Sequence, residues 1–363
     1  MTEPVRDIAQ NVALQHEQYG PRPLPLFLDM LRRETAASPQ HRAAALAGLR
    51  RYQDAPRTRR RASPARFRKG AARLRDGRIG PDGDRPPVVL VPSLINPPFV
   101  LDLAPGHSLL AHLAQAGFAP WLLDWGQPRA RDAGLDLAGH ITQRLLPLIA
   151  KLERPPLLVG YCLGGTLALA AAAALPAGAV AGVATIAAPW HFAGYDQDTR
   201  DAMAALWARV APGARRLGVL PMEVLQAAFW QLDPARTIAK YAAFATMDDE
   251  AAARFVLLED WANAGAPLTL AAGADLFDTL LTRDAPGRGA WQIGGRAAVP
   301  RALACPTIEF VSLTDRIAPA ATAAGLAERR DVAAGHVGMM VGSRARDLLW
   351  TPLTAWLTQV ADG

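Results

Sequence analysis

The hydrophobic pattern of the chain changes character twice. Apolar residues in Leu24–Leu31 and Ala43–Leu49 recur at helical spacing, so residues 1–55 are expected to form helices. From Val88 onward, short apolar runs typical of buried parallel strands alternate with longer helical patterns. This alternation predicts an α/β fold with a doubly wound, mostly parallel sheet.

The expected elements of this sheet follow one another regularly. Strands are expected at 88–91, 120–123, 157–159, 180–186 and 306–311, and helices at 106–116, 135–152 and 344–360. The alternation stops between Trp190 and Pro300, where the pattern is helical and holds five of the nine tryptophans, Trp190, Trp207, Trp230, Trp261 and Trp291. We expect this insertion to be a cap, most of whose rings pack its own core.

A strand, a tight turn and a helix meet in Gly160-Tyr161-Cys162-Leu163-Gly164-Gly165. This is the layout of the nucleophile elbow of α/β-hydrolases, G-x-S-x-G, with cysteine where serine usually stands. Bulky side chains two residues either side of the nucleophile would clash, and Gly160 and Gly164 avoid that clash. The motif predicts an α/β-hydrolase fold with Cys162 as the nucleophile.

The predicted organisation therefore has four parts. Residues 1–80 form a helical and Arg-rich N-terminal region, 81–190 the first part of the α/β-hydrolase core, 191–300 the cap subdomain, and 301–363 the second part of the core. The fold is thus expected to carry a helical cap insertion and an N-terminal helical extension.

An acid and a histidine follow the elbow in the order that α/β-hydrolases use. Asp315 comes after the expected strand 306–311, and His336 precedes the last helix. His191, near the start of the cap, could line a pocket, but a structural role is expected. We predict a catalytic triad of Cys162, Asp315 and His336.

The residue types suggest acyl transfer from thioesters. The attacking species of a cysteine is its thiolate, which the positive end of a helix and a neighbouring histidine would stabilise. The oxyanion would be held by the backbone amide of Leu163 and, from the loop after the first central strand, that of Leu94. Cys305 is interpreted as a small buried hydrophobe.

Charge is concentrated in one segment. The chain has a formal net charge of +6, but residues 50–78 alone carry +10. Such an Arg-rich segment could bind nucleic acid, an anionic surface or substrate phosphates, or it could be a solvated connector, which is the expected case. No aromatic-interleaved or zinc-type module accompanies it, so nucleic-acid binding is not expected.

Other features bear on location and cofactors. The first residues lack the apolar stretch of a secretory signal, and two cysteines make no disulfide framework, so a cytoplasmic protein is expected. The uncharged window 155–190 is broken by Pro176 and Gly178, so no transmembrane segment is expected. Neither a metal site nor a phosphate-binding glycine loop is evident.

Taken together, the motifs resemble those of the polyhydroxyalkanoate synthases, most of all the short class III catalytic subunit. The resemblance rests on Gly160–Gly165 (G-x-C-x-G-G), Leu94–Phe99 (L-V-N-x-P-Y), Asp124–Pro128 (D-W-G-x-P), Leu258–Trp261 (M-E-K-W), Cys305-Pro306 (C-P), Leu313–Asp315 (L-Q-D) and Gly335–Gly338 (G-H-I-G). It covers about residues 86–358. Arg316 departs from the histidine common after the triad aspartate, and residues 1–80 have no clear counterpart.

The resemblance implies an acyltransferase that polymerises 3-hydroxyacyl-CoA thioesters into polyester. Cys162 would carry the acyl group, with His336 as base and Asp315 assisting. Coenzyme A enters as part of the substrate, with no separate cofactor. The implied partners are a second copy in a homodimer, a second synthase subunit and the granule surface. An intracellular depolymerase, an acyl-CoA thioesterase with the same triad and a non-catalytic granule-binding protein remain alternatives.

Overall fold

The structure, a computed structural model, describes residues 19–57, 61–79 and 86–363. It consists of two compact units that are each built from separate segments. Described residues before 58 join 233–263 in the smaller unit, and the remaining described residues form the larger one. The smaller unit holds helices α2 (Leu24–Glu34), α3 (Pro39–Asp54), α10 (Pro234–Phe244) and α11 (Asp249–Asn263).

Close packing of α3 on α10 explains why the smaller unit forms. A Cβ atom at Gly48 would lie 1.8 Å from the carbonyl oxygen of Tyr241, so only glycine lets the two backbones approach this closely. The Tyr52 hydroxyl donates to Asp260 at 2.6 Å, and Arg57 pairs with the same carboxylate at 3.2 Å. The expected N-terminal helices are confirmed at α2 and α3.

This division differs from the predicted domains. Residues 233–263 lie within the expected cap, 191–300, yet they form a unit with the N-terminal helices. The expected boundary at residue 80 also differs, because residues 61–79 belong to the larger unit. Helical periodicity shows which face of a helix is buried but not which partner buries it.

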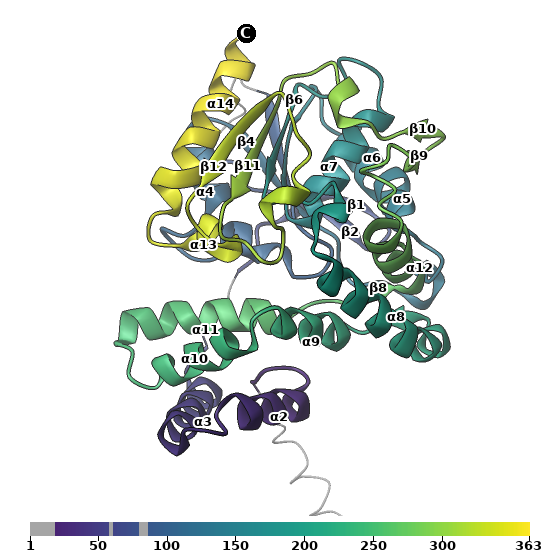
Figure 1. Cartoon of the computed structure of the whole chain (residues 1–363). Coiled ribbons are helices and arrows are strands. Elements are labelled where there is room, and N and C mark those ends of the chain that lie inside the picture. The colour runs from purple at the N-terminus through teal and green to yellow at the C-terminus, as the bar shows by residue number, and fades with distance from the viewer. Residues whose placement is uncertain (1–18, 58–60, 80–85) are drawn as a thin grey trace, which may run out of the picture. The chain divides into compact units, whose positions relative to one another are not determined.

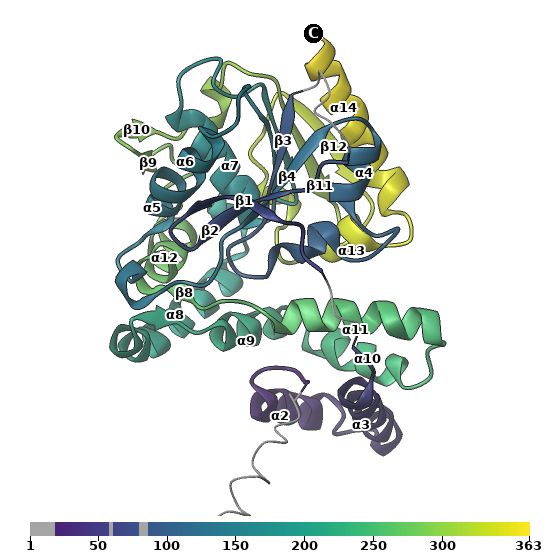
Figure 2. The same ribbon diagram turned by 180° about the vertical axis from the view of Figure 1, so that it is seen from behind.

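An eight-stranded sheet organises the larger unit (Figures 1 and 2). In spatial order its strands are β1 (Ala65–Lys69), β2 (Ala72–Asp76), β4 (Ala119–Asp124), β3 (Pro87–Val91), β5 (Leu157–Tyr161), β6 (Gly182–Ile186), β11 (Thr307–Ser312) and β12 (Glu328–Val332). The pairs from β4 to β12 are parallel, whereas β1 and β2 form an antiparallel hairpin on β4. Short hairpins β7 (Val219–Leu220)–β8 (Leu268–Thr269) and β9 (Gln292–Ile293)–β10 (Arg296–Ala297) lie outside it.

Helices cover both faces of this sheet. Helices α4 (Leu109–Gln115), α13 (His336–Val341) and α14 (Thr351–Asp362) lie on one face, and α5 (Leu137–His140), α6 (Leu146–Ile149), α7 (Leu163–Ala174) and α12 (Leu270–Ala274) on the other (Figures 1 and 2). The unit also has α8 (Gln197–Leu217), α9 (Met222–Leu232) and the π-helical segments η3 (Ile141–Leu145), η5 (Asp275–Thr282) and η8 (Arg346–Trp350). The mostly parallel sheet with helices on both faces confirms the predicted α/β-hydrolase fold class. Within the part of the chain that is described, no helix combines the length and apolarity needed to span a bilayer.

The five expected strands are all present, and their residues are almost fully buried. Three further strands, β1, β2 and β12, were not predicted, and β1 and β12 are the two edges of the sheet. Four of the five residues of β12, Glu-Arg-Arg-Asp, are charged and exposed. Charged side chains commonly protect the edge of a sheet, but they leave no apolar run from which the strand could be predicted.

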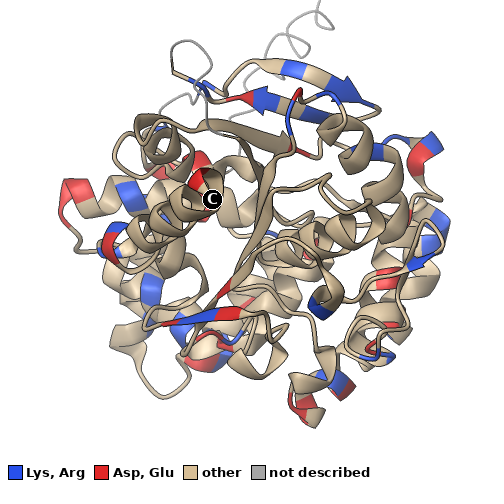
Figure 3. Cartoon of the chain, turned by 90° about the horizontal axis from the view of Figure 1, so that it is seen from above, with Lys and Arg blue, Asp and Glu red and all other residues tan. Residues whose placement is uncertain are grey.

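The Arg-rich segment contradicts its expected role as a solvated connector. Its described part contains the end of α3 and both strands of the hairpin, and basic residues follow the two strands (Figure 3). Asp124 forms ion pairs with Arg73 at 3.3 Å and Arg75 at 2.7 Å, and Asp76 forms one with Arg78 at 2.8 Å. Asp124 holds the hairpin against β4, and both carboxylates neutralise part of the charge of the segment.

Candidate active site

Cys162 occupies a strained turn between β5 and α7. Its backbone angles, φ 56° and ψ −134°, are rare for any residue other than glycine. A Cβ atom at Gly160 would lie 2.3 Å from the Cα of Gly165, and one at Gly164 would lie 2.1 Å from the carbonyl oxygen of Val91. The predicted reason for the elbow glycines is therefore confirmed: neighbouring backbone leaves no room for side chains.

We expect Gly164→Ala to destabilise the fold by at least about 2 kcal/mol, because the added methyl group meets the rigid backbone of β3 rather than a flexible side chain. Gly134→Ala is the matched control, since nothing lies within 4 Å of its added Cβ. Urea denaturation of both variants measures the difference. Equal stabilities would contradict the steric account of the elbow.

The structure brings His336 and Asp315 together beside Cys162. Asp315 lies in the loop after β11, and His336 is the first residue of α13. The Nδ1 atom of His336 is 2.5 Å from Oδ2 of Asp315, whose Oδ1 accepts the backbone N–H groups of Ile317 and Ala318 at 2.7 and 3.1 Å. Since Nδ1 is committed to the carboxylate, Nε2 is the ring nitrogen left to exchange a proton with Cys162.

Two anionic groups control the charge of this histidine. Burial alone lowers the pKa of His336, but the Asp315 carboxylate and the Cys162 thiolate outweigh it and raise that pKa above its ordinary value. The geometry thus stabilises the protonated form of His336. The Tyr161 ring packs 5.0 Å from the imidazole ring and keeps it in place.

Two backbone amides, those of Leu163 and Leu94, are the predicted oxyanion donors. Leu163 is the first residue of α7, so its N–H has no partner within that helix. In the loop after β3, the Ile95 N–H donates to the Ser93 hydroxyl at 3.1 Å, which favours Leu94 over Ile95 as a second donor. The Leu94 side chain is buried and faces a neighbouring cavity rather than the one at Cys162.

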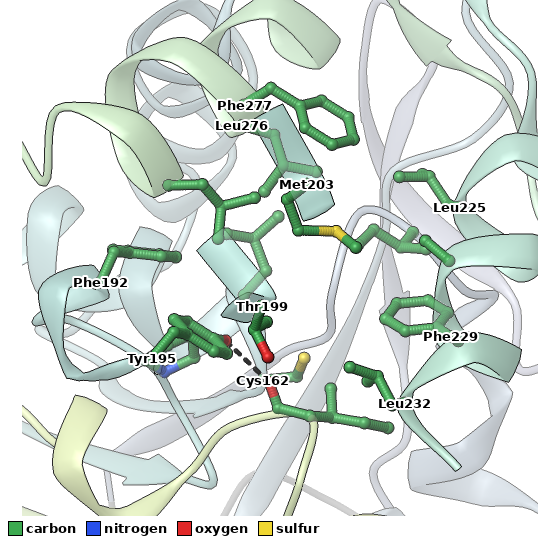
Figure 4. Close-up of a pocket in the computed structure, with 16 residues that line it drawn as sticks. Cys162, Phe192, Tyr195, Thr199, Met203, Leu225, Phe229, Leu232, Leu276 and Phe277 are labelled. Carbon is green, nitrogen blue, oxygen red and sulfur yellow. Dashed lines mark hydrogen bonds between the residues drawn. The ribbon is translucent and has the colours of Figure 1, made fainter. Parts of the chain in front are cut away.

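Tyr195 is a site residue that sequence reasoning missed. Its hydroxyl donates to the carbonyl oxygen of Ile317 at 2.7 Å and so ties the segment after β6 to the loop that carries Asp315 (Figure 4). Burial, together with the charges of Cys162 and Asp315, raises the pKa of Tyr195 and keeps its phenol neutral. No motif signals this residue, because its role depends on a contact made 122 residues away.

An apolar cavity of about 100 Å³ opens at Cys162 (Figure 4). Its walls include Phe192, Tyr195, Met203, Leu225 and Phe229. None of the five tryptophans between 190 and 291 lines it. They are buried, and Trp207, for example, stacks on Phe277 at 5.2 Å. They therefore pack in protein cores as expected, but Trp190, Trp207 and Trp291 share the core of the sheet rather than a separate core of the cap. His191 does not line the cavity either.

Neither the second cysteine nor a bound metal forms part of the site as the described residues build it. Cys305 is half-buried, and burial raises the pKa of its thiol. Neither cysteine is in a disulfide. Within the described ranges, no group of three or more His, Cys, Asp or Glu side chains is arranged to hold a metal ion.

Comparison with known proteins identifies relatives in sequence. No protein-family model matches the chain. It is 26% identical over 295 residues to the poly(3-hydroxyalkanoate) polymerase subunit PhaC of Haloferax mediterranei, covering 75% of this chain and 58% of that protein. It is 22% identical over 298 residues to the same-named subunit of Allochromatium vinosum, covering 77% of this chain and 82% of that one.

Comparison with solved structures finds enzymes at low sequence identity. A carboxylesterase of Nitrososphaera gargenis is 16% identical, with a TM-score of 0.49 over 81% of this chain and 97% of that one. A monoacylglycerol lipase of Paleococcus ferrophilus is also 16% identical, with a TM-score of 0.46 over 76% and 94%. The sequence comparisons and the sheet topology together show that this chain is a relative of the poly(3-hydroxyalkanoate) polymerase subunits and has an α/β-hydrolase fold.

Proposed function

We propose that this protein transfers hydroxyacyl groups from coenzyme A thioesters to a growing polyester through an acyl-enzyme at Cys162. One observation carries the proposal. Cys162 is held at a strained elbow, next to a buried His336–Asp315 pair, at the wall of an apolar cavity. The similarity to polymerase subunits supports a polyester product.

The first step forms the acyl-enzyme. Nε2 of His336 takes the thiol proton of Cys162, and the thiolate attacks the thioester carbonyl. The amides of Leu163 and Leu94 hold the developing oxyanion. When the tetrahedral intermediate collapses, the carbon–sulfur bond to coenzyme A breaks, and the leaving thiolate takes the proton from His336. One thioester is exchanged for another, so the step is nearly isoenergetic.

The second step lengthens the chain. The 3-hydroxyl of the acyl group on Cys162 attacks the carbonyl of a further coenzyme A thioester, and His336 carries its proton to the departing coenzyme A thiolate. One ester forms for each thioester broken. Both Asp315 oxygens are engaged and its side chain is fully buried, which supports a role in orienting His336 rather than direct contact with the substrate hydroxyl.

The location and partners form part of the same proposal. We place the protein in the cytoplasm and at the surface of polyester granules, because its product is an insoluble polymer. The coenzyme A thioester is the substrate, and the chemistry of the triad requires no further cofactor. Assembly as a homodimer, or with a second synthase subunit, is tested by the mass of the active complex in solution.

The test is incubation of the purified protein with 3-hydroxybutyryl-CoA, with free coenzyme A and insoluble polymer measured in the same sample. We expect both to appear in proportion. Coenzyme A release without polymer would replace the proposal with a thioesterase or depolymerase, because water would then be the second nucleophile. Release of neither would contradict catalysis by this chain alone.

A further inference from the structure

A second, larger cavity lies beside the loop that follows β3. Its volume is about 570 Å³, and the turn of the β1–β2 hairpin, the loop after β3 and the loop after β4 enclose it. We call it the arginine cavity, after Arg68, Arg73 and Arg129 in its wall. Its arginine side chains have no part in the steps described above.

The charges of the arginine cavity are unbalanced. Asp124 is its only acidic wall residue among those described, and Arg73 shares that carboxylate with Arg75. Arg68 and Arg129 are exposed and make no ion pair within the described residues. The wall therefore carries excess positive charge and has two guanidinium groups available for a ligand.

Strand register gives a second reason to expect an anion-binding site here. Arg68 lies directly opposite Arg73 in the β1–β2 ladder, so both side chains emerge on the same face of the hairpin. Like charges in directly opposite positions destabilise a strand pair. An anion bound between them would remove that repulsion, and the basic strands can be followed in Figure 3.

The arginine cavity and the cavity at Cys162 both lie at the carboxyl ends of the parallel strands. Val91 of β3 pairs with Gly160 of β5, Leu90 with Leu122 of β4, and Arg73 of β2 with Asp124 at the end of β4. At about 4.8 Å per strand, β2 lies roughly 14 Å from the strand that leads into Cys162. The loop after β3 separates the two cavities: Ile95 faces the one at Cys162, and Leu94 and Asn96 face the arginine cavity.

We propose that the arginine cavity binds the phosphate groups of the coenzyme A thioester whose acyl group reaches Cys162. This inference rests on the proposed function. Coenzyme A carries its thiol and its phosphates at opposite ends of a long flexible arm. An apolar cavity for the acyl group and a cationic cavity for the phosphates, both at the carboxyl ends of the strands, match this arrangement. Guanidinium groups suit phosphate oxygens because they donate paired hydrogen bonds.

Binding measured by calorimetry tests the inference without turnover. With the Cys162→Ala protein, we expect the further double change Arg68→Ala/Arg129→Ala to weaken coenzyme A binding roughly ten-fold, as for charge-assisted contacts at a partly exposed site. Adenosine 3′,5′-bisphosphate should lose affinity similarly, while pantetheine, which lacks these phosphates, should not. Arg330→Ala is the matched control, an exposed arginine of β12 at the opposite edge of the sheet.

Steady-state kinetics with two thioesters, one with and one without the phosphates of coenzyme A, distinguish a coenzyme A site from a general anion site. For 3-hydroxybutyryl-CoA the double variant should raise KM roughly ten-fold with little change in kcat, whereas KM for the N-acetylcysteamine thioester, which has no phosphate, should stay unchanged. Equal effects on both thioesters, or on neither, would overturn the inference. So would inorganic phosphate that binds at the two arginines without competing with coenzyme A.

The two proposals fail in different ways. Arginine-dependent binding of coenzyme A without any acyl transfer would leave the arginine cavity in place and remove the proposed function. Normal polymer synthesis by the double variant, at an unchanged KM for the coenzyme A thioester, would remove the role of the arginine cavity and leave the proposed function in place.

Discussion

Cys162→Ala should reduce coenzyme A release from 3-hydroxybutyryl-CoA to the background rate, because no other group at the elbow can form the acyl-enzyme. Cys162→Ser should lower the rate by on the order of 10³ or more, since a serine hydroxyl ionises far less readily than a thiol. A thiol-sensitive dye, added after the protein is removed, measures free coenzyme A. Both variants should keep the free energy of unfolding, measured by urea denaturation, within about 1 kcal/mol of the wild-type value.

Cys305→Ala serves as the cysteine control. Cys305 is half-buried and faces a separate cavity at the C-terminal end of α7, the opposite end of that helix from Cys162. Its removal should leave coenzyme A release unchanged. Activity that survives Cys162→Ala and disappears with Cys305→Ala would refute the site.

Asp315→Asn should lower kcat by on the order of 10³ to 10⁴ while leaving the fold intact. An amide in place of the carboxylate can present an N–H to Nδ1 of His336, which then places the imidazole proton on Nε2. In that tautomer Nε2 cannot accept the proton of Cys162. Initial rates at saturating thioester measure the loss, and near-normal rates would show that Asp315 does not act through His336.

The same substitution has a pH signature in stability. Because the pKa of His336 is raised in the folded state, its protonated form stabilises the fold fully below the unfolded-state pKa of about 6.5. That contribution falls as pH rises toward the folded-state pKa. Asp315→Asn removes the main charge behind it, so the variant should lose more stability at pH 6 than at pH 9, measured by urea denaturation at both. An equal loss at the two values would contradict the imidazolium–carboxylate pair.

The sequence by itself determined the elbow and the central strands. Gly160 and Gly164 are required by the crowded backbone of the turn at Cys162, which is a feature of the elbow motif itself. Strands such as β3 and β5 are apolar throughout because both faces of a parallel sheet are covered. The order of Cys162, Asp315 and His336 was readable for a related reason: in this fold, chain order specifies which strand end carries each group. Local chemistry and topology are enough for such features.

Only the tertiary structure decided the rest. The β1–β2 hairpin depends on Asp124, about 50 residues from its arginines, so its sequence looked like a charged connector. Tyr195 matters through the Ile317 carbonyl, and α10 and α11 belong with α2 and α3 through the close approach at Gly48. In each case the partner is distant along the chain, and a residue's own periodicity or charge cannot specify which distant surface will bury or neutralise it.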